Sequence, residues 1–411
     1  MPPAAPPLLT AQPWMSAPET RAVIAALTEN GGAARFVGGC VRDALVGRPV
    51  KDIDIATPDP PERVMQRLGS AAIRAIPTGI DHGTVTAVIG QRHFEITTLR
   101  RDVEPLGRRA RVAFTDDWAA DAARRDFTIN ALSADPDGTV HDPFGGFADL
   151  NAGRVRFVGD PETRIREDVL RLLRFFRFQA YYGKGAPDEA GLAACRRLAH
   201  LLPTLSGERV AGEVLRLMLG PDSPEIVQLM VSEGVLAHIF PELRDLHRLR
   251  AMVRLEERHA TPDALRRLAS LLPRDPTGAA ALAERLRLSN AEAERLAALV
   301  VPPVEVSPLM DGRARRRALY RLGAALFRDL ALIDAAGRDA DEGLASLLAD
   351  AASWAAPRLP IKGQDALDLG LAPGKRVGEL VTAVERWWME NDFRADRAAC
   401  LTYLKQIAGV K

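Results

Sequence analysis

The sequence predicts an α+β protein in which a small mixed sheet with helices is followed by an all-helical remainder. Residues 16–150 mix short strand-like segments with helical ones, and Gly and Asp recur between them. After Asp160-Pro161, a helix cap followed by a favoured first-turn proline, the pattern is almost wholly helical. The length of 411 residues exceeds what one hydrophobic core usually organises. We expect a disordered tail over 1–15, a head over 16–150, a helical neck over 151–220 and a helical body and tail over 221–411.

The expected elements of the head follow in chain order. Ser16-Ala17-Pro18-Glu19 has the form of a capping box and predicts a helix that carries Ile24 and Leu27. Gly38-Gly39 predicts a turn from a strand into a short helix that closes near Gly47. Alternation of apolar and polar residues predicts strands at 34–37, 52–56, 72–76, 84–89 and 93–98. A helix is predicted at 61–68. Further on, Val301-Pro302-Pro303 is the best candidate for a joint.

Composition excludes several classes of protein. Apolar residues make up 47% and charged residues 27%, and no stretch is apolar for the length of a bilayer, so we expect no membrane association. Cys40, Cys195 and Cys400 are odd in number and far apart, which argues against disulfides and zinc and favours the cytoplasm. The first seven residues lack the features of a signal peptide. A net charge of +1 gives no whole-chain signature of nucleic-acid binding, and nothing implies a protein partner.

Two carboxylates share one face of a predicted strand. The period of two places Asp52 and Asp54 on one side and both intervening isoleucines on the other. Like charges so arranged are tolerated in a solvated edge strand or where a divalent cation offsets them. Glu95, on the strand 93–98, adds a third carboxylate opposite two apolar residues. Because three such groups suit two Mg²⁺ about 4 Å apart, we expect Asp52, Asp54 and Glu95 to be catalytic and the two aspartates to be metal ligands.

The glycine pair precedes these carboxylates and suits a phosphate group. Gly38 and Gly39 let backbone N–H groups approach a triphosphate, and the start of a helix favours negative charge. Arg42, one turn into the helix, is placed to pair with phosphate oxygens. The glycine pair alone is weak support for a phosphate-binding site, because most Gly-Gly pairs are merely turns.

Three motifs, taken in order, resemble a known family. The segment from Gly38 to Gly47, with Asp52–Asp54, resembles the nucleotidyltransferase motif of the DNA polymerase beta superfamily. Arg124–Ala131 and Asp142–Leu150 resemble the second and third motifs of class II CCA-adding enzymes and bacterial poly(A) polymerases. The resemblance implies a polymerase-beta-like nucleotidyltransferase head and template-independent addition of CCA to tRNA from CTP and ATP with Mg²⁺.

The segment 167–177 offers a means of choosing the base. We expect one helix in which an apolar stripe faces inward while Asp168 and Arg171 pair on the other side. An exposed ion pair of little consequence is the alternative. As acceptor and donor, the two side chains match the edges of cytosine and adenine and mismatch those of guanine and uracil. The segment resembles the base-recognition helix of the family.

The resemblance assigns further residues. Glu208–Glu213 resembles the motif that supports this helix, which implies a structural role. Residues 363–378 resemble the family's tail, which approaches the tRNA elbow, whereas Trp387-Trp388 is expected in a core. The basic run 313–317 fits a tRNA contact or a solvated helix face equally well. Nucleotide contacts are expected from Gly38, Gly39, Arg42, Arg125, Asp126, Asp168, Arg171, Arg174 and Arg177.

Alternatives within and outside the family stay open. The irregular stretch 100–123 matches the flexible loop of complete CCA-adding relatives, and Leu106–Ala110 within it is interpreted as loop and not as a poly(A) polymerase signature. An A-adding enzyme or a poly(A) polymerase remains an alternative. A non-catalytic RNA-binding protein would have lost a metal carboxylate, and all three are present. The one His-Asp pair, His141-Asp142, lies in the third motif, so no HD phosphohydrolase activity is expected.

Overall fold

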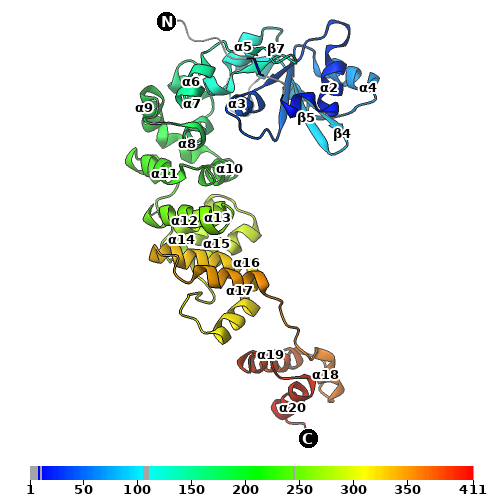
Figure 1. Cartoon of the computed structure of the whole chain (residues 1–411), viewed down its shortest axis with the longest axis vertical. Helices are drawn as coiled ribbons and strands as arrows, with labels where there is room; N and C mark the ends of the chain where they lie inside the picture. Colours follow the sequence, from blue (N-terminus) through cyan, green and yellow to red (C-terminus); the bar gives the residue numbers. More distant parts are fainter. Residues whose placement is uncertain (1–7, 10–11, 105–110, 244–245, 411) are drawn as a thin grey trace. The chain divides into compact units, whose positions relative to one another are not determined.

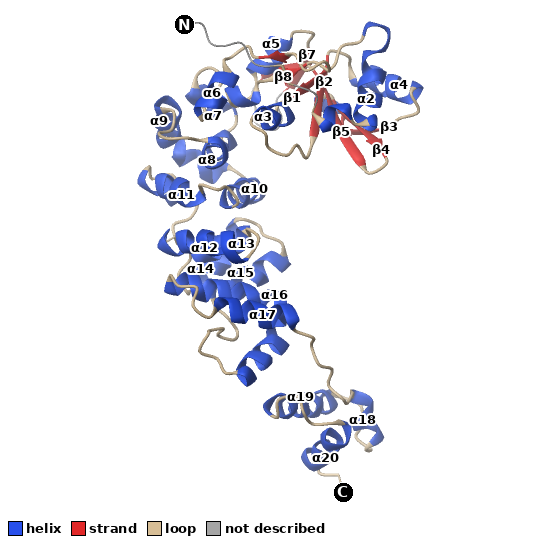
Figure 2. Cartoon of the chain, in the orientation of Figure 1, coloured by secondary structure: helices blue, strands red, loops and turns tan. Residues whose placement is uncertain are grey.

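A seven-stranded mixed sheet organises the head. Figure 2 draws the strands in red. The computed structural model describes residues 8–9, 12–104, 111–243 and 246–410, in two units of which the first ends at Pro241 and the second begins at Glu242 (Figure 1). The strand order is β3-β4-β5-β2-β1-β8-β9, in which β2 and β5 are parallel and the other neighbours antiparallel. The strands are β1 (Arg35–Val37), β2 (Ile53–Thr57), β3 (Arg74–Gly79), β4 (Thr84–Ile89), β5 (Arg92–Thr98), β8 (Ser133–Ala134) and β9 (Val140–His141).

The α+β fold class and the strands of the head are confirmed. In β2, Ile53 and Ile55 are buried on either side of the less buried Asp54, as the alternation predicts. The strand expected at 72–76 begins two residues later, because Ala72 has a φ of +55° and ends the turn after the preceding helix. The helices of the head are α1 (Pro13–Ser16), α2 (Pro18–Thr28), η1 (Glu29–Gly31), α3 (Gly39–Leu45), α4 (Pro61–Ser70), η2 (Ile80–His82), α5 (Trp118–Ala123) and η4 (Thr128–Asn130).

The start of the chain differs from the prediction. Helix α1 occupies part of the segment expected to be disordered, and Leu9 is buried with its N–H donating to the Gly138 carbonyl at 2.8 Å. Helix α2 has Ala17 as its cap, while the Ser16 hydroxyl donates back to α1. The predicted capping box is therefore wrong, because proline at the first helical position moves the start of the helix past Ser16. Residues 1–7 and 10–11 lie outside the described ranges.

The stretch 100–123, expected to be irregular, contains regular structure. Strands β6 (Arg100–Glu104) and β7 (Arg111–Phe114) pair as a two-stranded antiparallel sheet, and α5 follows them. The loop interpretation is therefore wrong for these residues. The segment Leu106–Ala110 lies outside the described residues.

The rest of the first unit is helical in its described part. Helix α7 begins at its predicted cap, where the Asp160 carboxylate accepts from the Thr163 N–H at 2.8 Å. The helix expected over 167–177 is interrupted, because Asp168 has extended backbone angles (φ −150°, ψ 105°) between α7 and α8. The elements are α6 (Gly146–Ala152), α7 (Pro161–Glu167), α8 (Leu170–Tyr182), α9 (Glu189–Leu198), η5 (Ala199–Thr204), α10 (Gly207–Met218), α11 (Ser223–Ser232) and η6 (Leu236–His238).

The second unit is helical in its described part. Val301–Pro303 connects α15 to α16 inside this unit, so it is not the joint between the two units. Of the helices in the described ranges, none combines the length and apolarity that a bilayer crossing requires. The helices are α12 (Leu246–His259), α13 (Ala264–Ser270), α14 (Pro276–Arg285), α15 (Asn290–Val300), α16 (Gly312–Arg338), α17 (Leu344–Ser353), α18 (Gly363–Asp368), α19 (Lys375–Glu390) and α20 (Arg397–Ala408).

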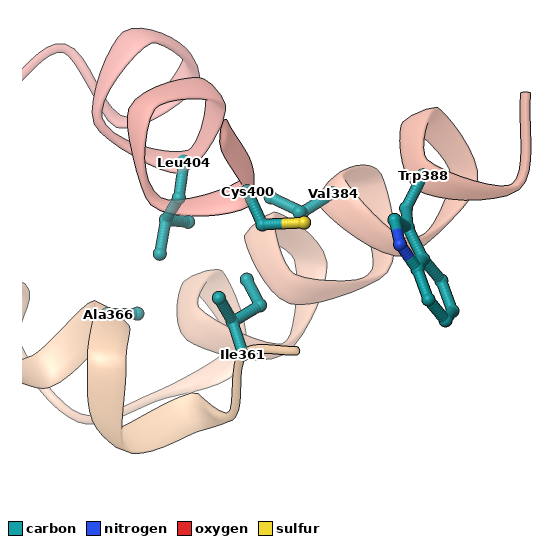
Figure 3. Close-up of a cluster of buried hydrophobic side chains, with 6 residues drawn as sticks. All are labelled: Ile361, Ala366, Val384, Trp388, Cys400 and Leu404. Atoms are coloured by element: carbon teal, nitrogen blue, oxygen red, sulfur yellow. The ribbon is translucent and has the colours of Figure 1, made fainter. Parts of the chain in front are cut away.

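The last three helices share a small apolar core (Figure 3). Trp388 is 2% exposed and its indole N–H donates to the Ala395 carbonyl, which confirms a core position. The buried cluster comprises Ile361, Ala366, Val384, Trp388, Cys400 and Leu404. In the basic run 313–317, Arg315 pairs with Asp350 and Arg316 with Asp392, so this run is partly engaged within the unit.

Candidate active site at the glycine turn and strands β2 and β5

Asp54 and Glu95 are neighbours across two parallel strands. They are register partners on β2 and β5, so both side chains leave the same face of the sheet. Asp52 is exposed and directly precedes β2. Burial, with the charges of Glu95 and Asp52, raises the pKa of Asp54 to about 6 against the opposing effect of Arg125 and Arg42. Burial and the two neighbouring carboxylates thus disfavour the ionisation of Asp54, an effect that a bound cation would reverse.

The donor set of this face suits a hard divalent cation. Carboxylate oxygens are the ligands that Mg²⁺ prefers, and the raised pKa of Asp54 marks a negative charge that lacks sufficient compensation. Within the described ranges, however, no three His, Cys, Asp or Glu side chains are gathered closely enough to hold a metal ion. The residues therefore fit a metal by their chemistry, while the expected three-carboxylate cluster is not assembled in this structure.

The glycine turn between β1 and α3 is flanked by two guanidinium groups. Gly38 has a φ of +68°, a conformation that favours glycine. A Cβ atom at Gly38 would lie 3.0 Å from Nη1 of Arg125, and one at Gly39 would lie 3.7 Å from Nη2 of Arg42. Since both arginines also act on the pKa of Asp54, the turn, the cations and the carboxylates form one site. This arrangement suits a triphosphate.

Arg42 is buried and held from several sides. Its Nε and Nη2 donate to the Asp43 carboxylate at 2.9 and 3.1 Å, and Nη1 donates to Oδ1 of Asn130 at 2.5 Å. Arg125 is held by Asp121, whose carboxylate lies 3.2 Å from Nη2. Burial acts to raise the pKa of Asp121, but the charges of Arg124 and Arg125 keep this pKa below its usual value. Both guanidinium groups are thus fixed before any ligand binds.

Helix α8 is joined to the head through Asp126. This buried carboxylate accepts from the Asn130 amide at 2.9 Å and from Nε of Arg174 at 2.6 Å. Glu213, buried on α10, accepts from Nε of Arg177 at 2.5 Å. Hydrogen bonds through Asp126 and Asn130 therefore link Arg174 to Arg42 beside the glycine turn. Glu213 holds Arg177 and lies 3.7 Å from Nη1 of Arg174, which supports the structural role expected of the segment 208–213.

The side chains of Asp168 and Arg171 bind other residues. Both carboxylate oxygens of Asp168 accept from Nη2 of Arg209, at 2.9 and 2.8 Å. Arg171 donates instead to Glu167 at 2.6 Å and to the Arg124 carbonyl at 3.0 Å. The expected pair is wrong for this structure, because the extended backbone at Asp168 removes the helical spacing on which it depended.

Sequence reasoning missed four residues of this site. Asn130 and Asp43 lie inside the quoted motifs, and their polar side chains beside Arg42 were a usable signal. Arg209 lies in the helix-supporting segment, and the signal that it offered was a charge opposite in sign to that of Asp168. Tyr182, whose hydroxyl donates to Oδ1 of Asp43, offered only its position on the same helix as the expected arginines.

The sheet, the glycine turn and the paired carboxylates define a nucleotidyltransferase, and comparison with known proteins agrees. Residues 34–156 match the family described as "Poly A polymerase head domain". Residues 186–246 match "Probable RNA and SrmB- binding site of polymerase A".

Relatives match over nearly the whole chain. CCA tRNA nucleotidyltransferase 1, mitochondrial, of Mus musculus is 34% identical, covering 90% of this chain and 86% of that protein. The CCA-adding enzyme of Lactococcus lactis subsp. cremoris (strain MG1363) is 30% identical, covering 95% and 96%. The crystal structure of the Bacillus stearothermophilus CCA-adding enzyme in complex with CTP is 27% identical, with a TM-score of 0.78 and coverage of 97% and 98%. The chain belongs to the family of CCA-adding tRNA nucleotidyltransferases.

Proposed function

We propose that this enzyme adds CCA to the 3′ end of tRNA, using CTP and ATP and releasing pyrophosphate, without a nucleic-acid template. The observation that carries the proposal is the glycine turn between Arg42 and Arg125, beside the register partners Asp54 and Glu95. The family membership supplies the substrate class, since relatives named for CCA addition match along nearly the whole chain.

The proposed reaction is in-line attack on the α-phosphate. The tRNA 3′-oxygen forms a bond to that phosphorus while the bond to the bridging oxygen of pyrophosphate breaks. Arg42, Arg125 and the N–H groups of the glycine turn hold the triphosphate and offset the charge on the leaving group. Asp52 and Asp54, with Glu95 nearby, would hold Mg²⁺, which activates the 3′-hydroxyl and stabilises charge on the phosphates when bound.

Base selection is proposed for Asp168 and Arg171, each held by its own partner. Arg209 orients the Asp168 carboxylate, while Glu167 and the Arg124 carbonyl orient Arg171. An acceptor and a donor fixed in this way suit cytosine and adenine, because guanine and uracil would leave both protein groups without partners. Arg174, Arg177 and Asp126 would extend these contacts around the nucleotide.

The division of labour along the chain is also a proposal. We assign nucleotidyl transfer to residues 16–150, base recognition to 151–220 and tRNA binding to 221–411. We further propose a reducing compartment, the cytoplasm, which the three buried free cysteines support.

The test offers the purified protein three tRNAs, ending before CCA, after C and after CC, with each nucleoside triphosphate alone and in mixture. Completion of all three ends, with GTP and UTP refused, is the expected result. One A added to the CC-ended tRNA alone would indicate an A-adding enzyme. Long A tracts on any RNA would indicate a poly(A) polymerase, and no extension would indicate a non-catalytic RNA-binding protein.

A further inference from the structure

Tyr182, the last residue of α8, contacts both charged residues at the centre of α3. Its hydroxyl donates to Oδ1 of Asp43 at 2.5 Å, and its ring centroid lies 4.4 Å from Cζ of Arg42. Tyr182 and Asp43, which form the hydrogen bond, are 139 positions apart in the sequence. Burial raises the pKa of Tyr182, so the phenol keeps its proton and remains a donor at neutral pH. One side chain of the neck helix thus contacts the helix that follows the glycine turn.

The carboxylate that Tyr182 holds is the one that orients Arg42. Asp43 accepts from Nε and Nη2 of Arg42, so both of its oxygens face the guanidinium group. Adjacent residues on a helix do not ordinarily face each other, and such a pair needs an outside partner to fix its geometry. The Tyr182 hydroxyl is that partner for Asp43, and Asn130 is that partner for Nη1.

This geometry leaves Arg42 able to bind a further acceptor. A guanidinium group has five N–H donors, and within the described ranges three are used, by Asp43 and Asn130. Each terminal nitrogen therefore keeps one N–H, and Nη2 is the atom that lies beside Gly39. Arg42 is otherwise buried. Among its contacts is the Phe178 ring, whose centroid lies 5.1 Å from Cζ of Arg42.

The end of α8 also binds the segment after α3. Cζ of Arg48 lies 4.5 Å from the Tyr182 ring centroid, and Nη2 of Arg48 donates to the Tyr181 carbonyl at 2.5 Å. A cation at the C-terminal end of a helix is favourable, because the last carbonyls lack partners within the helix. The contacts of Tyr182 therefore join the end of α8 to α3 and to the segment after it, through Asp43, Arg42 and Arg48.

We propose that Tyr182 is a positioning residue for triphosphate binding, which acts by holding Asp43 and so fixing the Arg42 guanidinium group beside Gly39. The proposal rests on the proposed function, because it takes the ligand of Arg42 to be the triphosphate of CTP or ATP. Since the triphosphate is common to both nucleotides, Tyr182 affects the use of both equally and does not affect the choice of base.

The decisive variant is Tyr182→Phe, which keeps the ring between the arginines and removes only the hydroxyl. KM is measured for CTP on tRNA lacking CCA and for ATP on tRNA ending in CC. Both KM values are expected to rise about tenfold and by the same factor, the lower end of the range for one hydrogen bond to a charged group, with kcat within about twofold. The matched control is Tyr181→Phe, whose hydroxyl donates to the Arg216 carbonyl and not to Asp43.

A second comparison separates positioning from packing. In an Arg42→Lys background, Tyr182→Phe is expected to cause no further rise in KM, because the group that it positions is gone. Equal KM values for Tyr182→Phe and Tyr181→Phe, or a full additional effect in the Arg42→Lys background, would overturn the proposal. If the wild-type protein extends no tRNA, the proposed function itself fails, and that result is distinct from an active wild type with an unaffected variant.

Discussion

Asp54 and Glu95 face the same side of the sheet as register partners of parallel strands, and burial together with the charges of Glu95 and Asp52 raises the pKa of Asp54 to about 6. The ionised form needed to bind a cation is therefore the form that the metal-free protein disfavours. A bound cation would offset the unfavourable ionisation of Asp54. This relationship leads to the first prediction.

Asp54→Asn should stabilise the metal-free protein at pH 7 and above. The folded pKa of about 6 lies above the usual 3.8, so ionisation of Asp54 disfavours the folded state. The penalty is complete above pH 6, shrinks as pH falls and disappears below about pH 4. Melting temperatures of both proteins across this range, in a chelating buffer, measure the difference. A wild type that is as stable as the variant at pH 8 would contradict the cost assigned to ionising the buried Asp54 beside Glu95.

Asp52→Ala should abolish addition of C and of A while leaving tRNA binding nearly unchanged. Asp52 is exposed and precedes β2, so its loss removes a proposed metal ligand without disturbing the core. Extension assays and a filter-binding measurement on the same preparation check the two halves. Retained extension would remove Asp52 from the catalytic residues.

Gly38→Ala should cost more than Gly47→Ala. Both glycines have a φ of +68°, so both substitutions carry backbone strain of about 1–3 kcal/mol, and the strain is greater at Gly38, whose ψ of −121° lies outside the left-handed helical region. A Cβ atom at Gly47 meets open space, whereas one at Gly38 meets Nη1 of Arg125 at 3.0 Å. We expect a larger loss of stability with Gly38→Ala than with Gly47→Ala, and a rise in KM for CTP and ATP only with Gly38→Ala. Chemical denaturation and steady-state kinetics separate the two effects.

Arg209→Ala should relax the choice of base, as Asp168→Ala should. Without Arg209, the Asp168 carboxylate loses two of its three hydrogen bonds and keeps the one from the Leu170 N–H. The preference for CTP over UTP is expected to fall about tenfold in kcat/KM, the loss of roughly 1.4 kcal/mol of discrimination. Arg216→Ala on the same helix is the control, because the Arg216 side chain is largely exposed. Unchanged selectivity in Asp168→Ala would refute the role of this residue as a protein template.

Local patterns explain what sequence analysis predicted correctly. The period of two around Asp54 and around Glu95 predicts both strands and the faces of their carboxylates. The parallel pairing that brings the two residues into register depends on the strand order of the whole sheet. The motifs supplied the family, and through it a function that periodicity alone does not contain.

The errors have identifiable physical causes. Of the predicted apolar stripe Val169, Leu172, Leu173 and Phe176, the last three are buried and Val169 is half-buried, but the stripe does not indicate the helix break at Asp168. The pairing of Asp168 with Arg209 and of Tyr182 with Asp43 joins residues 41 and 139 positions apart. Such contacts depend on how the helices pack, which local spacing does not determine.

The central claim is that this site adds the sequence CCA, and only that sequence, to tRNA. The most direct measurement incubates tRNA lacking CCA with the protein, Mg²⁺ and all four nucleoside triphosphates, and then sequences the 3′ ends, with Asp52→Ala as the matched control. The wild type is expected to produce ends that read CCA, and the variant is expected to leave the ends unextended. Ends of any other sequence, or unextended ends with the active-site residues intact, would contradict it.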